Sequence, residues 1–156
     1  MSEKIDTIDR RILGELQCDA TLSVDQLSER VGLSRNACWR RVRILEDDGV
    51  ITGRVALVDA EKLGVGLSVF IIVRTSSHDP EWLAKFRAAV TVFPEITGVY
   101  RMSGDLDYVL RARVADVKAY DRLYQRLIAK VPLSDVSASF VMEEIKETTM
   151  VPVELR

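Results

Sequence analysis

The stretch from Ser34 to Arg43 concentrates the side chains that recognise nucleic acid. It contains four arginines and no acidic residue, although the whole chain of 156 residues carries a formal net charge of −2. A polyanion responds to such local charge more than to the net charge of a protein. This stretch is therefore the first candidate for a DNA-binding element.

A helix that begins after Ser34 would gather these polar side chains on one face, opposite an apolar stripe that includes Cys38. Arginine can make paired hydrogen bonds to guanine, and asparagine to adenine, each pairing giving about 1–3 kcal/mol of discrimination. Arg35 and Asn36, near the start of the helix, are the base-reading candidates. The predicted DNA-binding residues are Ser34, Arg35, Asn36, Trp39, Arg40, Arg43 and Arg54.

Several of these side chains have alternative interpretations. Trp39 can contact a sugar or a thymine methyl group, or it can cover the junction between two helices. Arg41 borders the apolar stripe and is either structural or directed at a phosphate, and Arg54 either contacts the DNA backbone or minor groove or is solvated. The bland alternative for the whole cluster is that its arginines are solvated or paired with the acids at the helix end, Glu46, Asp47 and Asp48.

The surrounding sequence predicts the elements that would position this helix. Apolar residues at helical spacing indicate a first helix, Ser23 is a good N-cap for a second, and Gly32 can end that second helix in the left-handed conformation. Together these features predict a winged helix-turn-helix domain over residues 1–57. Its predicted elements are helices over 5–16 and 24–31, a third helix from Ser34 that stops at 47–49, and wing strands over 50–51 and 54–57.

The second half of the chain has the order βαββαβ, which is the ferredoxin-like arrangement and gives an α+β fold class. Two helices should cover one sheet face. The other face carries Phe70, Ile72 and Val109, so we expect a second subunit to cover it. Residues 58–66 are the predicted linker and 67–156 the second domain, with strands over 67–75, 96–102, 108–114 and 136–145 and helices over 80–93 and 117–131.

Composition excludes several classes of protein. The chain is 47% hydrophobic and 29% charged, without an apolar run long enough for a membrane span, so we expect a cytoplasmic protein. Cys18 and Cys38 are far apart in the sequence, and His78 is the single histidine. We therefore expect structural thiols and predict neither a metal site nor a cofactor. We expect no enzyme, because the motifs of nucleophilic, phosphate-binding and metal catalysis are missing from the sequence.

Several motifs along nearly the whole chain resemble those of the Lrp/AsnC (feast/famine) transcriptional regulators. The first half contributes Ile8-Asp9-Arg10-Arg11-Ile12-Leu13, Val31-Gly32-Leu33-Ser34 and Gly49-Val50-Ile51. The second half resembles the amino-acid-sensing (RAM, ACT-like) domain of that family through Pro94-Glu95, Ser103-Gly104-Asp105-Leu106-Asp107-Tyr108, Ala119-Tyr120 and Lys146-Glu147-Thr148-Thr149. The resemblance implies that residues 67–156 sense an effector and form oligomers.

A finer resemblance is to the DecR-type subgroup, whose members respond to cysteine. It is carried by Cys38-Trp39-Arg40-Arg41, Leu45-Glu46-Asp47-Asp48-Gly49, Arg101-Met102-Ser103-Gly104 and Asp135-Val136-Ser137. L-cysteine is therefore the first candidate effector, and leucine-like or other small neutral amino acids come next.

The resemblance implies that the amino acid binds between subunits, near the turn from Ser103 to Tyr108. An aspartate of this turn could hold the ammonium group, and backbone N–H groups around Gly104 could hold the carboxylate. The competing interpretation is a plain hairpin turn, in which Asp107 hydrogen-bonds its own backbone. The predicted effector-binding residues are Tyr100, Met102, Ser103, Gly104, Asp105, Asp107, Tyr108, Ala138 and Ser139.

Two positions depart from the family pattern. Members commonly have Pro-Gly-Val before the last strand, whereas Val131-Pro132-Leu133 lacks the glycine. Ala138 stands where many relatives carry a hydroxyl. Both departures alter the surroundings of the predicted effector site.

The expected partners follow from this architecture. A homodimer, assembling further to a tetramer or octamer, would place its recognition helices on a pseudo-palindromic operator in double-stranded DNA. The main rival is an architectural DNA-binding protein without a specific effector.

Overall fold

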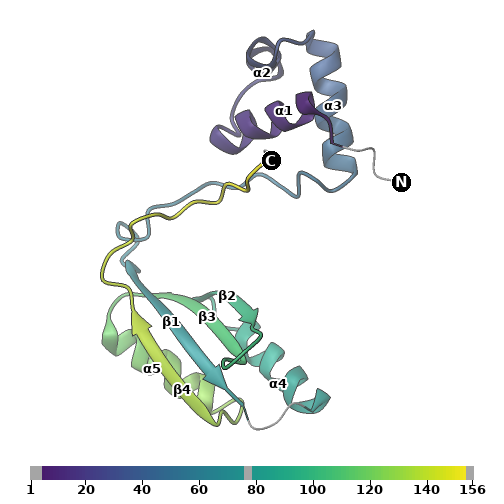
Figure 1. Ribbon diagram of the computed structural model, residues 1–156. Helices are drawn as coiled ribbons and strands as arrows, with labels where there is room; N and C mark the ends of the chain where they lie inside the picture. The colour runs from purple at the N-terminus through teal and green to yellow at the C-terminus, as the bar shows by residue number, and fades with distance from the viewer. Residues whose placement is uncertain (1–4, 76–78, 154–156) are drawn as a thin grey trace. The chain divides into compact units, whose positions relative to one another are not determined.

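The computed structural model describes residues 5–75 and 79–153 in two compact units (Figure 1). Of the described residues, 5–57 and 146–153 form one unit, and 58–75 and 79–145 form the other. His78, to which the sequence assigns no chemistry, lies outside the described residues. In the described part, no helix is long and apolar enough to cross a membrane.

The first unit contains the three predicted helices, α1 (Thr7–Cys18), α2 (Val24–Val31) and α3 (Arg35–Asp47). The first begins two residues later than its apolar spacing predicts, because the Asp6 side chain accepts a hydrogen bond from the Asp9 N–H and caps the helix there. The three helices enclose a small core of Ile12, Leu27, Val31, Cys38, Val42 and Leu45.

The predicted wing strands at 50–51 and 54–57 are not formed in the described structure. Gly49 has a φ of 71° and ends α3, and the Ile51 N–H then donates to the Leu45 carbonyl, so this segment belongs to the helix end. Residues 52–59 are exposed, with Val55 79% and Leu57 74% accessible, and so lack the packing that would hold a strand pair.

The end of the chain belongs to the helical unit, which differs from the predicted domain boundary. Val151 exchanges two hydrogen bonds with the Gln17 side chain, at 2.6 and 3.0 Å. Arg10 donates to the Val153 carbonyl at 2.6 Å. The predicted linker also differs, because residues 58–66 group with the sheet and its turn at Asp59 to Gly64 is hydrogen-bonded.

The second unit has the predicted ferredoxin-like order. Its sheet order is β2-β3-β1-β4 and each neighbouring pair is antiparallel. The last strand ends five residues before the predicted Ile145. In chain order the elements are β1 (Leu67–Arg74), α4 (Pro80–Thr91), β2 (Ile96–Arg101), β3 (Tyr108–Val114), α5 (Val117–Ile128) and β4 (Asp135–Phe140).

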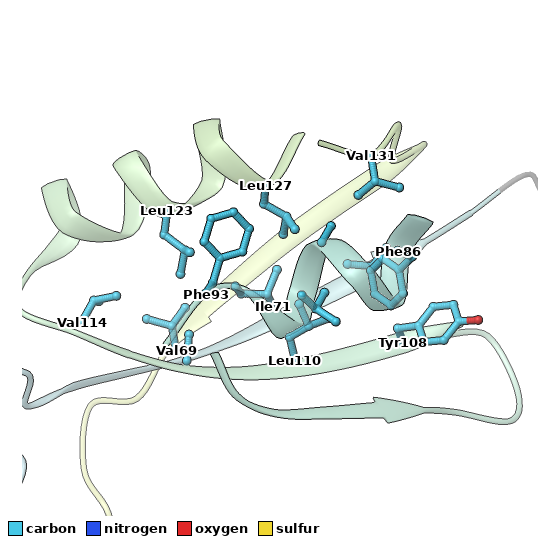
Figure 2. Packing of buried hydrophobic residues seen from close by; sticks show 14 of the residues in the cluster. Val69, Ile71, Phe86, Phe93, Tyr108, Leu110, Val114, Leu123, Leu127 and Val131 are labelled. Atoms are coloured by element: carbon cyan, nitrogen blue, oxygen red, sulfur yellow. The ribbon is translucent and has the colours of Figure 1, made fainter. Parts of the chain in front are cut away.

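Both helices lie on the same side of this sheet, and the core fills the space between the layers (Figure 2). Val69, Ile71 and Val73 point from the central strand into that core, as strand alternation requires. The opposite face carries Phe70, which is 39% exposed, and its neighbours Ile72 and Val109. We call this surface the open face of the sheet.

Candidate DNA-binding and effector sites

The recognition helix α3 is positioned by local turn chemistry. Gly32 ends α2 with a φ of 72°, and both Gly32 and Leu33 donate their N–H groups to the Ser28 carbonyl. Ser34 then caps α3, its Oγ accepting from the Ala37 N–H at 3.3 Å. The buried residues Cys38, Val42 and Leu45 anchor the helix to its own unit. The opposite face of α3 is therefore left for a partner.

That face carries the predicted DNA-binding residues in exposed positions. Ser34, Arg35, Asn36, Trp39, Arg40 and Arg43 are all exposed. Trp39 is 55% accessible, which favours a contact with a sugar or thymine methyl group over a role at the helix junction. Arg40 has no ion pair with any described residue. The helix start also offers free backbone N–H groups, which are suited to a phosphate.

Three of the arginines form exposed ion pairs. Arg35 lies 3.1 Å from Asp25, and Arg43 and Arg54 both reach Glu46, at 3.3 and 2.6 Å. The alternative that the arginines pair with the acids at the helix end therefore applies to Arg43 and Arg54, which both pair with Glu46. Exposed pairs of this kind contribute only about 0–1 kcal/mol, so DNA phosphates can replace the carboxylates. Through Glu46, Arg54 is held beside the recognition helix.

Glu46 makes the stability of this unit depend on pH. The hydrogen bond from Arg54 is the main cause that lowers the pKa of the Glu46 carboxyl. Its folded pKa then lies below the unfolded value of about 4.3, so the pair stabilises the fold above that pH and is lost as the pH falls through the folded pKa. We expect urea unfolding to show less stability at pH 3 than at pH 6. Glu46→Gln should reduce that difference most, and Arg54→Ala should reduce it by a smaller amount, because Arg43 still pairs with Glu46. An Arg54→Ala variant that kept the parent's full difference would contradict Arg54 as the main cause.

Arg41 is structural. Its guanidinium donates to Asp6 at 2.8 Å and to Asp9 at 2.7 Å, which are the two carboxylates of the capping box of α1. These hydrogen bonds raise the pKa of Arg41, and the one that Arg41 donates to Asp9 is the larger cause. The side chain is 29% exposed and joins the start of α1 to the recognition helix.

Arg41→Ala should lower the stability of the helical unit by about 1 kcal/mol, because it removes a charged hydrogen-bond partner from a partly buried carboxylate. Urea unfolding measures the change. Arg40→Ala is the matched control, an arginine one residue earlier on the same helix with no described partner, and should stay within about 0.5 kcal/mol of the parent. Equal stability of the two variants would contradict the structural role of Arg41.

The predicted effector turn is a closed loop between β2 and β3. The Met102 N–H donates to the Asp107 carbonyl at 2.9 Å, and Gly104 has a φ of 101°, a conformation that favours glycine. Space is open around the Gly104 Cα, so its backbone can be approached closely. The Asp105 side chain is exposed and has no partner among the described residues.

Sequence reasoning missed Arg74, which organises this turn. Its guanidinium donates to the Asp105 carbonyl at 3.2 Å and pairs with Asp135 at 2.7 Å. Asp107 accepts from the Thr75 N–H at 2.8 Å, a partner 32 residues away rather than the neighbouring backbone of a plain hairpin. An arginine at the end of an apolar strand was the one available signal.

The remaining effector candidates do not gather at one place in a single copy. Tyr100 lies on the open face with its ring over Gly98. Ser139 pairs with Phe70, four residues along β1 from Arg74, so it lies about 13 Å from the turn and could reach an effector only from another copy.

Tyr108 and Ala138 point to the helix-covered face, contrary to their predicted contact with an effector. Tyr108 is 6% exposed and packs against Trp82 and Phe86, with its hydroxyl at the rim of the core (Figure 2). Ala138 lies opposite Ile71 and packs against the same core. The cause is strand alternation, because a shift of one residue reverses the face.

Neither cysteine is placed to sense a ligand through thiol chemistry. Cys38 is fully buried, and burial raises the pKa of its thiol. Cys18 is exposed at the end of α1 in the other unit from the effector turn. Among the described residues, no group of histidine, cysteine and acidic side chains is arranged to hold a metal ion.

Two protein-family models match the chain, one to each half. The winged helix-turn-helix DNA-binding model matches residues 5–52, and the Lrp/AsnC ligand binding domain model matches residues 68–151. The second match includes the turn, Arg74 and the open face. It covers more than half of the chain.

Individual relatives agree with these matches. The DNA-binding transcriptional activator DecR of Escherichia coli is 50% identical over 96% of this chain and 99% of its own length. A crystal structure of an AsnC family transcriptional regulator from Agrobacterium tumefaciens is 51% identical, with a TM-score of 0.92 over 95% and 97% of the two chains. A transcriptional regulator from Neisseria meningitidis, solved as a complex with L-Met, is 34% identical, with a TM-score of 0.92 over 96% and 97%. The chain belongs to the Lrp/AsnC family of transcriptional regulators.

Proposed function

We propose that this chain is a sequence-specific DNA-binding transcriptional regulator whose DNA affinity is modulated by a small amino acid. The observation that carries the DNA-binding half is the exposed face of α3, where Arg35, Asn36 and Arg40 surround an N-capped helix start. Arg35 and Asn36 read base edges. Arg40, Arg43, Arg54 and Ser34 hold phosphates, and Trp39 contacts a sugar or methyl group.

The effector site is the turn from Ser103 to Asp107 with Arg74. The free Asp105 carboxylate receives the ammonium group of the amino acid, and the open backbone around Gly104 receives its carboxylate. Met102, which is 44% exposed, and Tyr100 offer apolar contacts, and Ser139 contributes from another copy. Tyr108 and Ala138 take no part in the proposed site, because they face the core. The residues therefore support a site completed between subunits.

L-cysteine is the proposed effector. Support comes from the DecR-type motifs of the sequence and from the 50% identity to DecR. The L-Met complex of the Neisseria regulator supports the wider class of sulfur-containing and small neutral amino acids. Recognition of the zwitterion through Asp105 and the backbone uses atoms that every amino acid shares, so selectivity rests on the side-chain contacts.

A homodimer is the proposed functional unit. Pairing through the open face would cover Phe70, Ile72 and Val109, and would place two α3 helices on the half-sites of a pseudo-palindromic operator. Such dimers assemble further into tetramers or octamers. The proposal assigns the chain to the cytoplasm and gives it no catalytic activity and no cofactor.

A thermal-shift screen of the twenty amino acids tests the sensor half. A ligand at 100 times its Kd stabilises the folded state by about 2.7 kcal/mol, which is readily measured. We expect L-cysteine to raise Tm most, followed by methionine and leucine. If no amino acid raised Tm or changed DNA binding, the architectural alternative would replace the sensor proposal.

A further inference from the structure

A groove beside strand β2 is unassigned by the proposed function. It lies between α4 and β2 in the sheet unit and has a volume of about 560 Å³. Its apolar lining residues include Leu83, Phe86 and Val90 on α4 and Ile96 and Val99 on β2. A groove of this size is large enough for a few side chains of an extended segment.

Strand β2 is an edge strand, and its outer backbone has no partner strand among the described residues. The Met102 N–H donates toward β3, to the Asp107 carbonyl, and main-chain groups alternate in direction along an antiparallel strand. Tyr100 therefore faces β3, and Val99 and Arg101 direct their N–H and C=O groups to the free edge. An exposed edge of this kind accepts an added strand.

Two arginines give this edge a charge preference. Arg87 on α4 and Arg101 on β2 both line the groove, and neither has an ion pair with any described residue. An added strand that carries a carboxylate is therefore favoured, with apolar side chains alternating beside it.

The chain itself contains a segment with these properties. Met142 is 95% exposed and Ile145 is 90% exposed, just beyond the end of β4. Between them, Glu144 pairs with Arg113 at 2.8 Å, while Glu143 is exposed without a partner among the described residues. In an extended backbone, Glu143 and Ile145 project to the same side.

This segment can reach the β2 edge only in another copy. Strands β4 and β2 lie at opposite edges of the sheet, three strand spacings or about 14 Å apart. Glu143 is three residues beyond Phe140, and three extended residues span at most about 10 Å.

We propose that residues 142–145 of one copy add antiparallel to the β2 edge of a second copy, with Glu143 opposite Arg101 and Ile145 opposite Val99. Only the antiparallel direction aligns both pairs, because the arginine follows its valine by two residues and the glutamate precedes its isoleucine by two. The Arg101–Glu143 pairing joins opposite charges, and the Val99–Ile145 pairing joins two apolar side chains. Cross-strand pairs of both kinds stabilise neighbouring strands.

The contact is heterologous, since each copy offers a donor segment at one sheet edge and an acceptor groove at the other. It links dimers into larger assemblies and stands whether or not the chain binds DNA. Its failure would therefore leave the proposed function intact.

Disulfide trapping tests the contact directly. Two full-length variants, Val99→Cys and Ile145→Cys, are each made in a Cys18→Ser background, mixed and treated with diamide. Cys38 is buried and does not compete for the disulfide. We expect a cross-linked dimer with a 99–145 disulfide, identified by mass spectrometry, in at least tenfold excess over the control mixture of Val117→Cys and Ile145→Cys. Val117 is an exposed apolar residue on α5. Equal yields in the two mixtures would overturn the proposal.

Charge reversal tests the register. Arg101→Glu should weaken the larger assembly at least tenfold, as measured by light scattering over a concentration series, and adding Glu143→Arg should restore it. An unchanged assembly in Arg101→Glu, or a loss that Glu143→Arg does not restore, would contradict the Arg101–Glu143 pairing.

Discussion

Replacing Arg35 and Asn36 together by alanine is expected to reduce operator affinity about 1000-fold. In the proposed site each residue supplies one paired contact to a base edge, and the loss of both costs at least about 2 kcal/mol per half-site. A dimer loses this at two half-sites, or about 4 kcal/mol, and every 1.4 kcal/mol is tenfold in Kd. Fluorescence anisotropy with a duplex selected by the protein from a random DNA library measures the change.

The matched control is Arg122→Ala with Gln125→Ala. These residues are also an exposed arginine and an exposed amide on one helix, but they lie on α5 of the other unit. The control should bind the operator as the parent does, and both double variants should keep the parent Tm within about 2 °C. If the α3 variant bound the operator within threefold of the parent, base reading by this helix would be wrong.

Asp105→Asn is expected to weaken amino-acid binding about 10- to 100-fold without changing stability. The substitution removes the negative charge that receives the ammonium group in the proposed site, and a hydrogen bond to a charged group contributes about 1.5–3 kcal/mol. The fold should be unaffected, because the Asp105 side chain is exposed and the turn is held through its carbonyl by Arg74. Isothermal titration with L-cysteine measures the affinity.

Asp121→Asn provides the control for loss of one negative charge, since Asp121 is an exposed aspartate on α5. It should leave the titration unchanged. Asp107→Asn has a different expected effect, a lower Tm, because Asp107 accepts from the Thr75 N–H. If Asp105→Asn bound L-cysteine with the affinity of the parent, the Asp105 carboxylate would not be part of the effector site.

The fold was largely predictable because its signals are local. Ser23 and Gly32 set the bounds of α2, Ser34 sets the start of α3, and alternation set most of the strands. The wing strands could not be predicted correctly, because Val55 and Leu57 have strand-forming composition but no packing partner. The docking of Val151 on Gln17 has no sequence signal, since a backbone contact across 134 residues leaves no pattern.

The exposed face of α3 was predictable because helical periodicity separates it from the buried stripe. Less of the candidate effector site could be predicted from the sequence. Tyr108 is a candidate because it ends the turn, and Ala138 because the last strand of a neighbouring subunit is expected to approach the site. Only the strand register decides which face the two residues occupy. Arg74 was missed because it reaches the turn from a strand 31 residues away from Asp105.

We expect an amino acid bound in one unit to change DNA binding by the other. Anisotropy titration of the selected operator with the full-length protein, with and without L-cysteine, tests it directly, with each of the other amino acids in parallel. Coupling of 1–3 kcal/mol predicts a 5- to 150-fold change in Kd, which Asp105→Asn should abolish. The coupling would be contradicted if no amino acid altered the operator affinity, the binding cooperativity or the assembly size.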